Sequence, residues 1–427
     1  MPKAYRHAHK ITISRDDIGT RDGYARGLTG TFFWSPCSVG WLTASTILII
    51  GLIALTLGGD WLVRAASRIS QALGVPPLVI GLTVVAFGTS APEFGVSLNS
   101  AWRGDTELAL GNVLGSNIFN VLFILGISAL ITPLTVAHQL IRIDVPLMIF
   151  ATALTLYLGW DGNLNTMDGA ILFGSLLAYL IWLAIDQIRS GGRSSNDYES
   201  ELPENETELT FKGIAIQVGL GLLGLLALAV GASFFVEGAV AIARLLQIDE
   251  LVIGLTIVAV GTSLPEIATS VMASIRGERD MAVGNVVGSN LFNILGVLGL
   301  TSMVSSGGVP VSEVAKTMDF PVALLVAIAC LPIFFSWRKV FRWEGALFLG
   351  YYIAYITHLI LNAQDHHATD NIRYIILWFA LPITVVLLGW ESLYSAIRRS
   401  NTEPSATPEP SEIDKENPEN ATDPHSD

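Results

Sequence analysis

The sequence predicts an all-α polytopic membrane protein made of two inverted five-helix repeats, that is ten transmembrane helices, followed by an eleventh C-terminal transmembrane helix. Three observations carry this prediction. The 427 residues are 51% hydrophobic and only 14% charged, whereas soluble proteins carry about 25% charged residues. Apolar runs of about 20 residues, long enough to cross the hydrocarbon core, recur along the chain. One stretch of the first half is also repeated in the second half.

Taken in order, the apolar runs predict spans at 41–62, 78–101, 108–131, 145–160, 170–188, 214–243, 251–275, 281–304, 320–337, 345–361 and 375–393. A hydrophilic stretch after the fifth span divides the chain into two halves of five spans each. The expected domain organisation is an N-terminal tail (1–39), a first half (40–188), an acidic cytoplasmic linker (189–212), a second half (213–361), an extra transmembrane helix (371–395) and a disordered acidic tail (400–427).

The repeated stretch covers 81–127 in the first half and 254–300 in the second half. The two copies align without a gap at an offset of 173, and 25 of the 47 positions are identical. They fall on the second and third spans and on the seventh and eighth spans. A shift of five spans is odd, so the second copy crosses the membrane in the opposite direction from the first. The sequence therefore predicts an inverted-topology repeat, which many secondary transporters contain.

The charges predict the location and the orientation of the chain. The formal net charge of −13 is concentrated in the linker and in the tail beyond Asn401, so the rest of the chain gives no sign of nucleic-acid binding. Lys and Arg are more frequent in the loops after the odd-numbered spans, which are therefore expected in the cytoplasm. We expect a multi-pass protein of the plasma (inner) membrane with the N-terminus outside and the C-terminus cytoplasmic. The basic residues of the N-terminal tail favour the opposite orientation, but several short loops outweigh one tail.

Each copy places one glutamate inside an apolar span, Glu93 in AFGTSAPEFG and Glu266 in AVGTSLPEIA. An ionisable side chain at membrane depth costs at least about 2.5–3.5 kcal/mol on insertion, so such residues are usually functional. The alternative is a structural carboxylate paired with a base. Neither span core contains a Lys or Arg for such a pair, which favours the functional interpretation.

The residues before each glutamate predict a broken helix. Pro92 and Pro265 have no N–H to donate, so the carbonyls of Gly88 and Gly261 lose their helical partners. Irregular backbone inside a membrane is tolerated only where it is buried or lines a cavity. Hydroxyl groups join the freed carbonyls and the two carboxylates in an all-oxygen set, which hard cations such as Ca²⁺ prefer. These hydroxyl groups belong to Thr89, Ser90, Thr262 and Ser263.

The third and eighth spans carry GNVLGSNIFN and GNVVGSNLFN. Ser116 and Asn120 share one helical face, as do Ser289 and Asn293. These side chains either bind cations or form hydrogen bonds between helices. The glycines form GxxxG patterns that allow helices to approach closely. We expect the remaining asparagines to cap or bond the broken helices; these are Asn112, Asn117, Asn285 and Asn290.

The paired GTSxPE and GNVxGSNxFN motifs resemble the alpha-repeats of the Na⁺/Ca²⁺ exchanger branch of the cation/Ca²⁺ antiporter superfamily, most closely its short prokaryotic members. The resemblance covers the repeats and, in outline, the ten-span arrangement. It implies a monomeric antiporter that exchanges Ca²⁺ for Na⁺ by alternating access at a midplane site. The first and sixth spans would slide or rock across this site. No cofactor is expected; the ligands are the transported Ca²⁺ and monovalent cations, and the surroundings are the lipid bilayer.

The same resemblance implies a ligand set at matching positions. Glu93 and Glu266 would be the bridging carboxylate ligands. Oxygens of Na⁺ or Ca²⁺ sites would come from the hydroxyl or backbone groups of Thr89, Ser90, Thr262, Ser263, Ser116 and Ser289, and from the carbonyls of Ala86 and Ala259. Asn120 matches the asparagine that is usual in the family. Asn293 departs from many members, which have an aspartate there, so two carboxylates rather than three are expected, and the Na⁺ stoichiometry and the coupling ion stay open.

Three alternatives remain at this point. The first is an H⁺- or K⁺-coupled Ca²⁺/cation antiporter, which a comparison of ion gradients would distinguish. The second is an intramembrane enzyme, disfavoured because the chain has no HExxH and no GxSxG motif and no histidine near either glutamate. The third is a channel lined by two equivalent acids, in which flux would not require a counter-ion.

Overall fold

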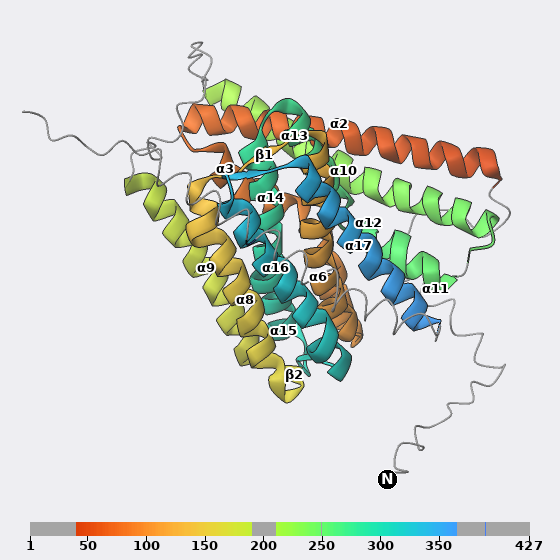
Figure 1. The fold of residues 1–427 in the computed structure, drawn as a ribbon. Coiled ribbons are helices and arrows are strands. Elements are labelled where there is room, and N and C mark those ends of the chain that lie inside the picture. The colour runs from red at the N-terminus through yellow and green to blue at the C-terminus, as the bar shows by residue number, and fades with distance from the viewer. Residues whose placement is uncertain (1–39, 190–210, 249, 365–388, 390–427) are drawn as a thin grey trace, which may run out of the picture.

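Helices dominate the structure, which is a computed structural model that describes residues 40–189, 211–248, 250–364 and 389 (Figure 1). In these ranges eight helical segments are long and apolar enough to cross a membrane, or nine if the bent pair Pro77–Thr89 and Ala91–Arg103 is one span. Both tails, most of the linker and, apart from residue 389, the eleventh predicted span lie outside the described residues. The chain is thus a multi-pass helical protein, as the hydropathy pattern predicts.

The first half begins with one long helix, continues as a series of shorter ones, and contains three π-helical segments. Its elements are α2 Trp41–Leu73, α3 Pro77–Ile80, η2 Gly81–Val85, α4 Ala86–Thr89, α5 Ala91–Arg103, α6 Glu107–Phe119, η3 Asn120–Leu125, α7 Gly126–Ile131, β1 Leu134–Thr135, η4 Leu140–Asp144, α8 Val145–Leu158, η5 Gly159–Asp161, β2 Asn163–Leu164 and α9 Thr166–Arg189.

The second half repeats this order of elements, including the three π-helical segments. Its elements are α10 Phe211–Leu245, α11 Glu250–Ile253, η6 Gly254–Val258, α12 Ala259–Gly261, α13 Leu264–Arg276, α14 Arg279–Leu291, η7 Phe292–Leu298, α15 Gly299–Val304, β3 Val309–Pro310, η8 Ala315–Asp319, α16 Phe320–Phe335, β4 Lys339–Val340 and α17 Arg342–Ala363. The duplication in the sequence is therefore a duplication of the fold.

The second and seventh spans are broken just before their glutamates. Ser90 has φ −79° and ψ 5°, and the helical pieces on either side of it are bent by 44°. Ser263 has nearly the same backbone, with φ −89° and ψ 8°. The proline two residues later lies in the first turn of the new helix in both copies, where its missing N–H costs no hydrogen bond. Each proline therefore ends one helix and begins the next.

Two short antiparallel sheets join the two halves. In the first, Leu134 of β1 pairs with Val340 of β4. In the second, Asn163 of β2 pairs with Pro310 of β3. Each sheet takes one strand from each half, and β1 and β4 follow the third and ninth spans whereas β2 and β3 follow the fourth and eighth. With an inverted repeat these loops lie at opposite ends of the bundle, so the halves are joined at both ends.

The helices α2 and α10 form a pair that runs across the direction of the other helices (Figure 1). Glycines allow their backbones to meet: a Cβ at Gly51 would lie 2.8 Å from the Gly231 carbonyl oxygen, and one at Gly58 would lie 2.8 Å from that of Gly224. Many large apolar side chains of both helices are exposed, as lipid-facing side chains are. The helices α2 and α10 therefore pack tightly against each other and less closely against the other helices.

Asp60 links α2 to the end of α13. Its Oδ1 accepts a hydrogen bond from Arg276 Nε at 2.6 Å and also contacts Arg276 Nη2. Its Oδ2 lies 2.8 Å from Arg64 Nη2. Nearby, the Ser67 hydroxyl donates to the Glu278 carboxylate. These contacts attach α2 to the second copy of the repeat at one end of the bundle.

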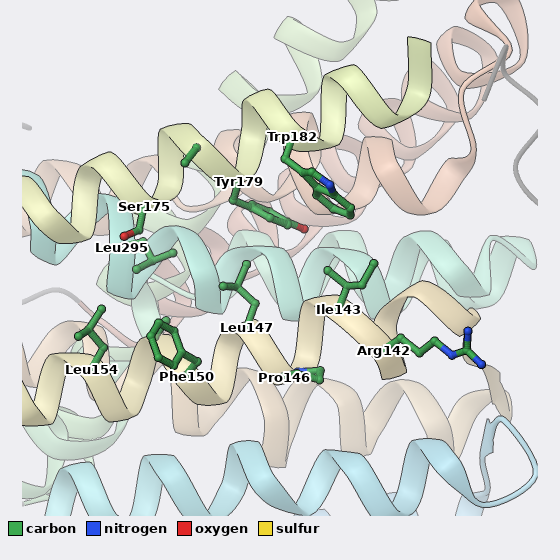
Figure 2. Close-up of a pocket in the computed structure, with 12 residues that line it drawn as sticks. Arg142, Ile143, Pro146, Leu147, Phe150, Leu154, Ser175, Tyr179, Trp182 and Leu295 are labelled. Carbon is green, nitrogen blue, oxygen red and sulfur yellow. The ribbon is translucent and has the colours of Figure 1, made fainter. Parts of the chain in front are cut away.

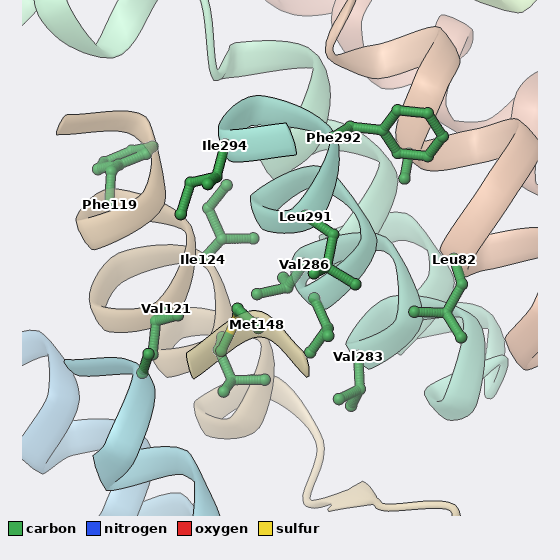
Figure 3. Close-up of a cluster of buried hydrophobic side chains, with 14 of the residues drawn as sticks. Leu82, Phe119, Val121, Ile124, Met148, Val283, Val286, Leu291, Phe292 and Ile294 are labelled. Carbon is green, nitrogen blue, oxygen red and sulfur yellow. The ribbon is translucent and has the colours of Figure 1, made fainter. Parts of the chain in front are cut away.

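The hydrophobic core surrounds α14 and η7, which with α15 form the most completely buried span of those the structure describes. Figure 3 shows Val283, Val286 and Leu291 of α14 among side chains from elements far apart in the sequence. Ile124 of η3 and Met148 of α8 belong to the same cluster and are almost fully buried. The second copy of the repeat therefore passes through the centre of the molecule.

Candidate cation-binding site

The two predicted carboxylates come together through serines that each belong to the other copy of the repeat. Ser90 Oγ donates to Glu266 Oε1 at 3.1 Å, and Ser263 Oγ lies at the same 3.1 Å from Glu93 Oε1. All four side chains are fully buried. Since each serine sits at a helix break and each glutamate follows its proline, the breaks aim both groups at a common centre between the copies.

The threonines at the breaks are held by the first asparagine of each GNVxGSNxFN motif. Thr89 Oγ1 and Asn285 Oδ1 are 3.3 Å apart, and Thr262 Oγ1 and Asn112 Oδ1 are also 3.3 Å apart. Asn285 also donates to Ser270 Oγ at 2.9 Å. The expectation that Asn112 and Asn285 bond the broken helices is therefore confirmed.

The structure also adds serines that the sequence reasoning missed. Ser270, together with Thr269, accepts hydrogen bonds from Asn285, and the equivalent Ser97 accepts one from Asn112 at 3.3 Å. Both serines are buried. The sequence contained a signal for these serines, because Ser97 and Ser270 occupy the same position in the two copies of the repeat.

The third and eighth spans contribute the remaining predicted ligands. Ser116 Oγ lies 3.1 Å from Ser263 Oγ, so it belongs to the same cluster as Glu93. Ser289 is buried. Asn120 Nδ2 donates to Asn290 Oδ1 at 3.0 Å, and Asn293 Nδ2 donates to Asn117 Oδ1 at 3.0 Å. The prediction that Asn117 and Asn290 cap or bond the broken helices was wrong, because their hydrogen bonds instead join the third and eighth spans to each other.

The predicted alanine carbonyls lie in unequal surroundings. Ala86 is fully buried, and its carbonyl oxygen lies 3.3 Å from Thr89 Oγ1. Ala259 is exposed. Thr262 of the seventh span and its partner Asn112 of the third span are half-buried, whereas the equivalent pair Thr89 and Asn285 is buried. The two half-sites thus have the same chemistry but different burial.

Several buried oxygens of the predicted set have no hydrogen-bond partner among the described residues. They are Glu93 Oε2, Glu266 Oε2, Asn120 Oδ1, Asn293 Oδ1 and Ser289 Oγ. An unsatisfied buried polar group costs about 1–3 kcal/mol, and more when it is charged. In the described part of the chain, no ion pair reaches either glutamate, and no cluster of three or more His, Cys, Asp or Glu side chains occurs. A cation held here would therefore meet two carboxylates and otherwise neutral oxygens.

The glycines of the two GNVxGSNxFN motifs differ in their packing. A Cβ at Gly288 of α14 would lie 2.7 Å from the Leu82 carbonyl oxygen, and one at Gly284 would lie 2.9 Å from that of Leu78. At Gly111 and Gly115 of α6, no described atom beyond the adjoining backbone of the same helix comes within 4 Å of such a Cβ. The first piece of the second span therefore lies directly against α14, whereas its counterpart in the seventh span does not lie against these glycines of α6.

A groove between α8 and α9 is separate from these residues. Figure 2 shows Phe150 and Leu154 of α8 facing Ser175, Tyr179 and Trp182 of α9. Apart from Arg142 at one end, its lining is mostly apolar, and none of the predicted ligands belongs to it. The groove is therefore not the cation site.

Two inverted broken-helix repeats around buried oxygens at the repeat interface define the class of secondary transporters. The family model described as sodium/calcium exchanger protein matches residues 43–185 and 216–361. The chain therefore belongs to the sodium/calcium exchanger family, as the repeat motifs predicted.

Individual relatives agree with this assignment. The chain is 36% identical to the putative antiporter CaxA of Alkalimonas amylolytica over 74% of this chain and 98% of that protein. It is 32% identical to the sodium/calcium exchanger MaX1 of Methanosarcina acetivorans over 73% of this chain and 97% of that one. The solved structure of the sodium-calcium exchanger NCX_Mj, soaked with 10 mM Na⁺ and zero Ca²⁺, matches with a TM-score of 0.63 at 32% identity, covering 74% of this chain and 99% of that chain.

The relatives are membrane transporters. The chain is accordingly an antiporter of the sodium/calcium exchanger type, and the enzyme alternative is excluded.

Proposed function

We propose that the protein exchanges Ca²⁺ for Na⁺ by alternating access, and that Glu93 and Glu266 bind the transported ions. One observation carries this proposal: both carboxylates are fully buried, each is bonded through one oxygen to a serine of the other copy, and the second oxygen of each has no partner among the described residues. Two such charges at membrane depth need cations nearby.

The neutral oxygens extend the proposed ligand set. Thr89, Ser90, Thr262, Ser263, Ser116, Ser289, Asn120 and Asn293 would supply side-chain oxygens, and Ala86 and Ala259 would supply carbonyls. All-oxygen coordination at flexible geometry suits Ca²⁺. The same two carboxylates can hold either one Ca²⁺ or the exchanging monovalent ions, but not both sets at once. Reorienting an empty site would carry two uncompensated charges through the membrane at a high cost in free energy, so transport would require exchange.

The movement would be carried by α2 and α10. Their backbones pack against each other at glycines, and most of their remaining surface is exposed, so the pair can slide as one unit across the fixed site.

We further propose a monomer in the plasma (inner) membrane with the N-terminus outside and the C-terminus in the cytoplasm. The distribution of Lys and Arg in the short loops supports this orientation. Protease digestion of sealed vesicles carrying a tag on either terminus tests this orientation.

The alternative coupling ions are H⁺ and K⁺. A proton could occupy either carboxylate, and K⁺ also accepts oxygen ligands. The distinguishing experiment is ⁴⁵Ca²⁺ uptake into proteoliposomes under imposed outward gradients of Na⁺, K⁺ and H⁺ in turn. We expect only the Na⁺ gradient to drive uptake. If a K⁺ or an H⁺ gradient alone drives Ca²⁺ uptake, that ion and not Na⁺ is the coupling ion.

The site itself is tested with Glu93→Gln and Glu266→Gln in the same assay. Removing one charged ligand from a buried site costs about 2–5 kcal/mol, so each variant should lower the uptake at limiting Ca²⁺ by about 30-fold or more. The matched control is Glu313→Gln, which neutralises an exposed acid whose side chain is 82% accessible. Normal Ca²⁺ flux in both buried variants would refute the proposed site.

A further inference from the structure

Four asparagines form a hydrogen-bond network that spans the two copies of the repeat. Asn117 Nδ2 donates to the Asn290 backbone carbonyl at 3.1 Å, and Asn290 Nδ2 donates to the Asn117 backbone carbonyl at 3.3 Å. Asn120 and Asn293 then donate to the side-chain oxygens of Asn290 and Asn117, respectively. All four residues are buried. These four bonds are two-fold symmetric, because each has its counterpart in the other copy. Asn290 Nδ2 additionally lies 3.5 Å from Met148 Sδ.

The chemistry of the acceptors fixes which way each amide points. A backbone carbonyl can only accept, so the amide nitrogens of Asn117 and Asn290 must face the opposite backbone. Their oxygens are then the groups presented to Asn293 and Asn120. An amide oxygen also can only accept, so Asn120 and Asn293 must turn their nitrogens toward it. Two backbone carbonyls thus set the orientation of all four side chains.

The remaining atoms are the side-chain oxygens of Asn120 and Asn293. Both are buried and have no partner among the described residues. Asn120 follows Ser116, and Asn293 follows Ser289, by one helical turn on the same face. Ser116 is bonded to Ser263, which is bonded to Glu93. The unpartnered amide oxygens therefore belong to the same face of each helix as the hydroxyl groups of the cation site.

We propose that Asn117 and Asn290 are positioning residues, which hold the side-chain oxygens of Asn120 and Asn293 toward the transported cation. This inference rests on the proposed function, since it assigns the orientation of two of its ligands. An amide that is not held could rotate and present its nitrogen, which repels a cation. Groups that orient a metal ligand typically change the metal affinity by about 10–100-fold when they are lost.

The network also explains the departure at position 293. An aspartate there would have no hydrogen to donate to Asn117 Oδ1 when it is ionised. Asn117 could offer its nitrogen instead only by giving up its bond to the Asn290 carbonyl. The symmetric network therefore fits an amide at both positions, and the site keeps two carboxylates flanked by two oriented neutral oxygens.

The test is a double-mutant cycle on each copy, read out as the Ca²⁺ concentration for half-maximal exchange. Asn290→Leu removes the acceptor that orients Asn120, and should raise this concentration about 10-fold while changing the maximal rate less. Asn120→Ala removes the oriented oxygen itself. In the Asn120→Ala background, Asn290→Leu should have no further effect on the half-maximal concentration, because no amide is left to orient. Asn117→Leu and Asn293→Ala form the matching cycle.

Additive effects in both cycles, or an unchanged half-maximal concentration in Asn290→Leu and Asn117→Leu, would overturn the inference. If Asn290→Leu does not fold, Asn290→Ser keeps an oxygen acceptor for Asn120 and should bind Ca²⁺ more tightly than Asn290→Ala. The glutamate variants distinguish a failure of the positioning role from a failure of the proposed cation site. If Glu93→Gln and Glu266→Gln lose exchange but the cycles are additive, only the positioning role fails. If the glutamate variants exchange normally, the proposed site fails.

Discussion

The helices α6 and α14 carry nearly the same sequence, GNVLGSN in one and GNVVGSN in the other, but they have different neighbours. At Gly284 and Gly288 the backbone of the second span lies in direct contact, whereas around Gly111 and Gly115 the described residues leave open space. Closely similar sequences are thus found in two packings within one molecule. The motif is therefore compatible with both the close and the open packing. An alternating mechanism requires each copy to adopt the two packings in turn.

The largest effect should follow from filling these glycine positions. A Cβ at Gly288 would lie 2.7 Å from the Leu82 carbonyl oxygen and 2.8 Å from Ala86 Cβ. Overpacking of this kind costs about 1–3 kcal/mol, so Gly288→Ala should lower the free energy of unfolding by about 2–3 kcal/mol. Thermal unfolding of the purified protein in detergent measures this change.

Gly115→Ala is the matched control for that experiment. Apart from the adjoining backbone of α6 itself, no described atom lies within 4 Å of the added methyl group, and alanine favours a helix over glycine by about 0.5–1 kcal/mol. The melting temperature should therefore stay the same or rise, while Ca²⁺ exchange slows, because the opposite packing would be hindered. Equal losses of stability in the two variants would contradict the unequal packing.

A smaller difference should separate the asparagines that hold the broken helices. Asn285 is buried and bonds Thr89, Thr269 and Ser270. Asn285→Ala would leave these partners unsatisfied and should lower the free energy of unfolding by about 2 kcal/mol. Asn112→Ala should cost less than about 1 kcal/mol, because Asn112 is half-buried and water can replace it. Denaturant or thermal unfolding of both variants tests the ranking, and a reversed ranking would contradict it.

The smallest expected effect concerns the attachment of α2 to α13. Asp60 pairs with Arg276 and Arg64, and its counterpart at an offset of 173 is Ser233, whose hydroxyl bonds only within its own helix, to the Ala229 carbonyl, among the contacts described. Asp60→Asn should lower the free energy of unfolding by about 1 kcal/mol, since the pair is partly exposed. Ser233→Ala should change it by less than about 0.5 kcal/mol. Melting curves that shift equally would show that the attachment is not specific to one copy.

Much of the fold follows from the sequence. The offset of 173 predicted which residues would occupy equivalent places, and the prolines predicted where the second and seventh spans break. Hydropathy could not reveal the π-helical segments such as η3 and η7, because a wider turn leaves the apolar pattern nearly unchanged. The eleventh span lies outside the described residues and stays a prediction, as do the domain boundaries.

The site was predictable as a set of residue types but not as a set of contacts. That Glu93 and Glu266 would be buried follows from their spans, yet which serine bonds which glutamate depends on how the two copies cross. The partners of Asn117 were mistaken for the same reason, since they lie across the pseudo-two-fold axis. Unequal packing of near-identical motifs cannot be read from either motif, because it is a property of the conformation.

The two carboxylates also determine how the protein would respond to a membrane potential. With amides at positions 120 and 293, the proposed site carries a charge of −2 when Glu93 and Glu266 are both ionised. One bound Ca²⁺ neutralises it, so the Ca²⁺-loaded reorientation would move no net charge. With n monovalent ions, the return step would carry n − 2 charges, and each charge that crosses the full potential is worth about 2.3 kcal/mol per 100 mV. Measuring how the exchange rate depends on the membrane potential would therefore give n, the number of monovalent ions moved in each cycle.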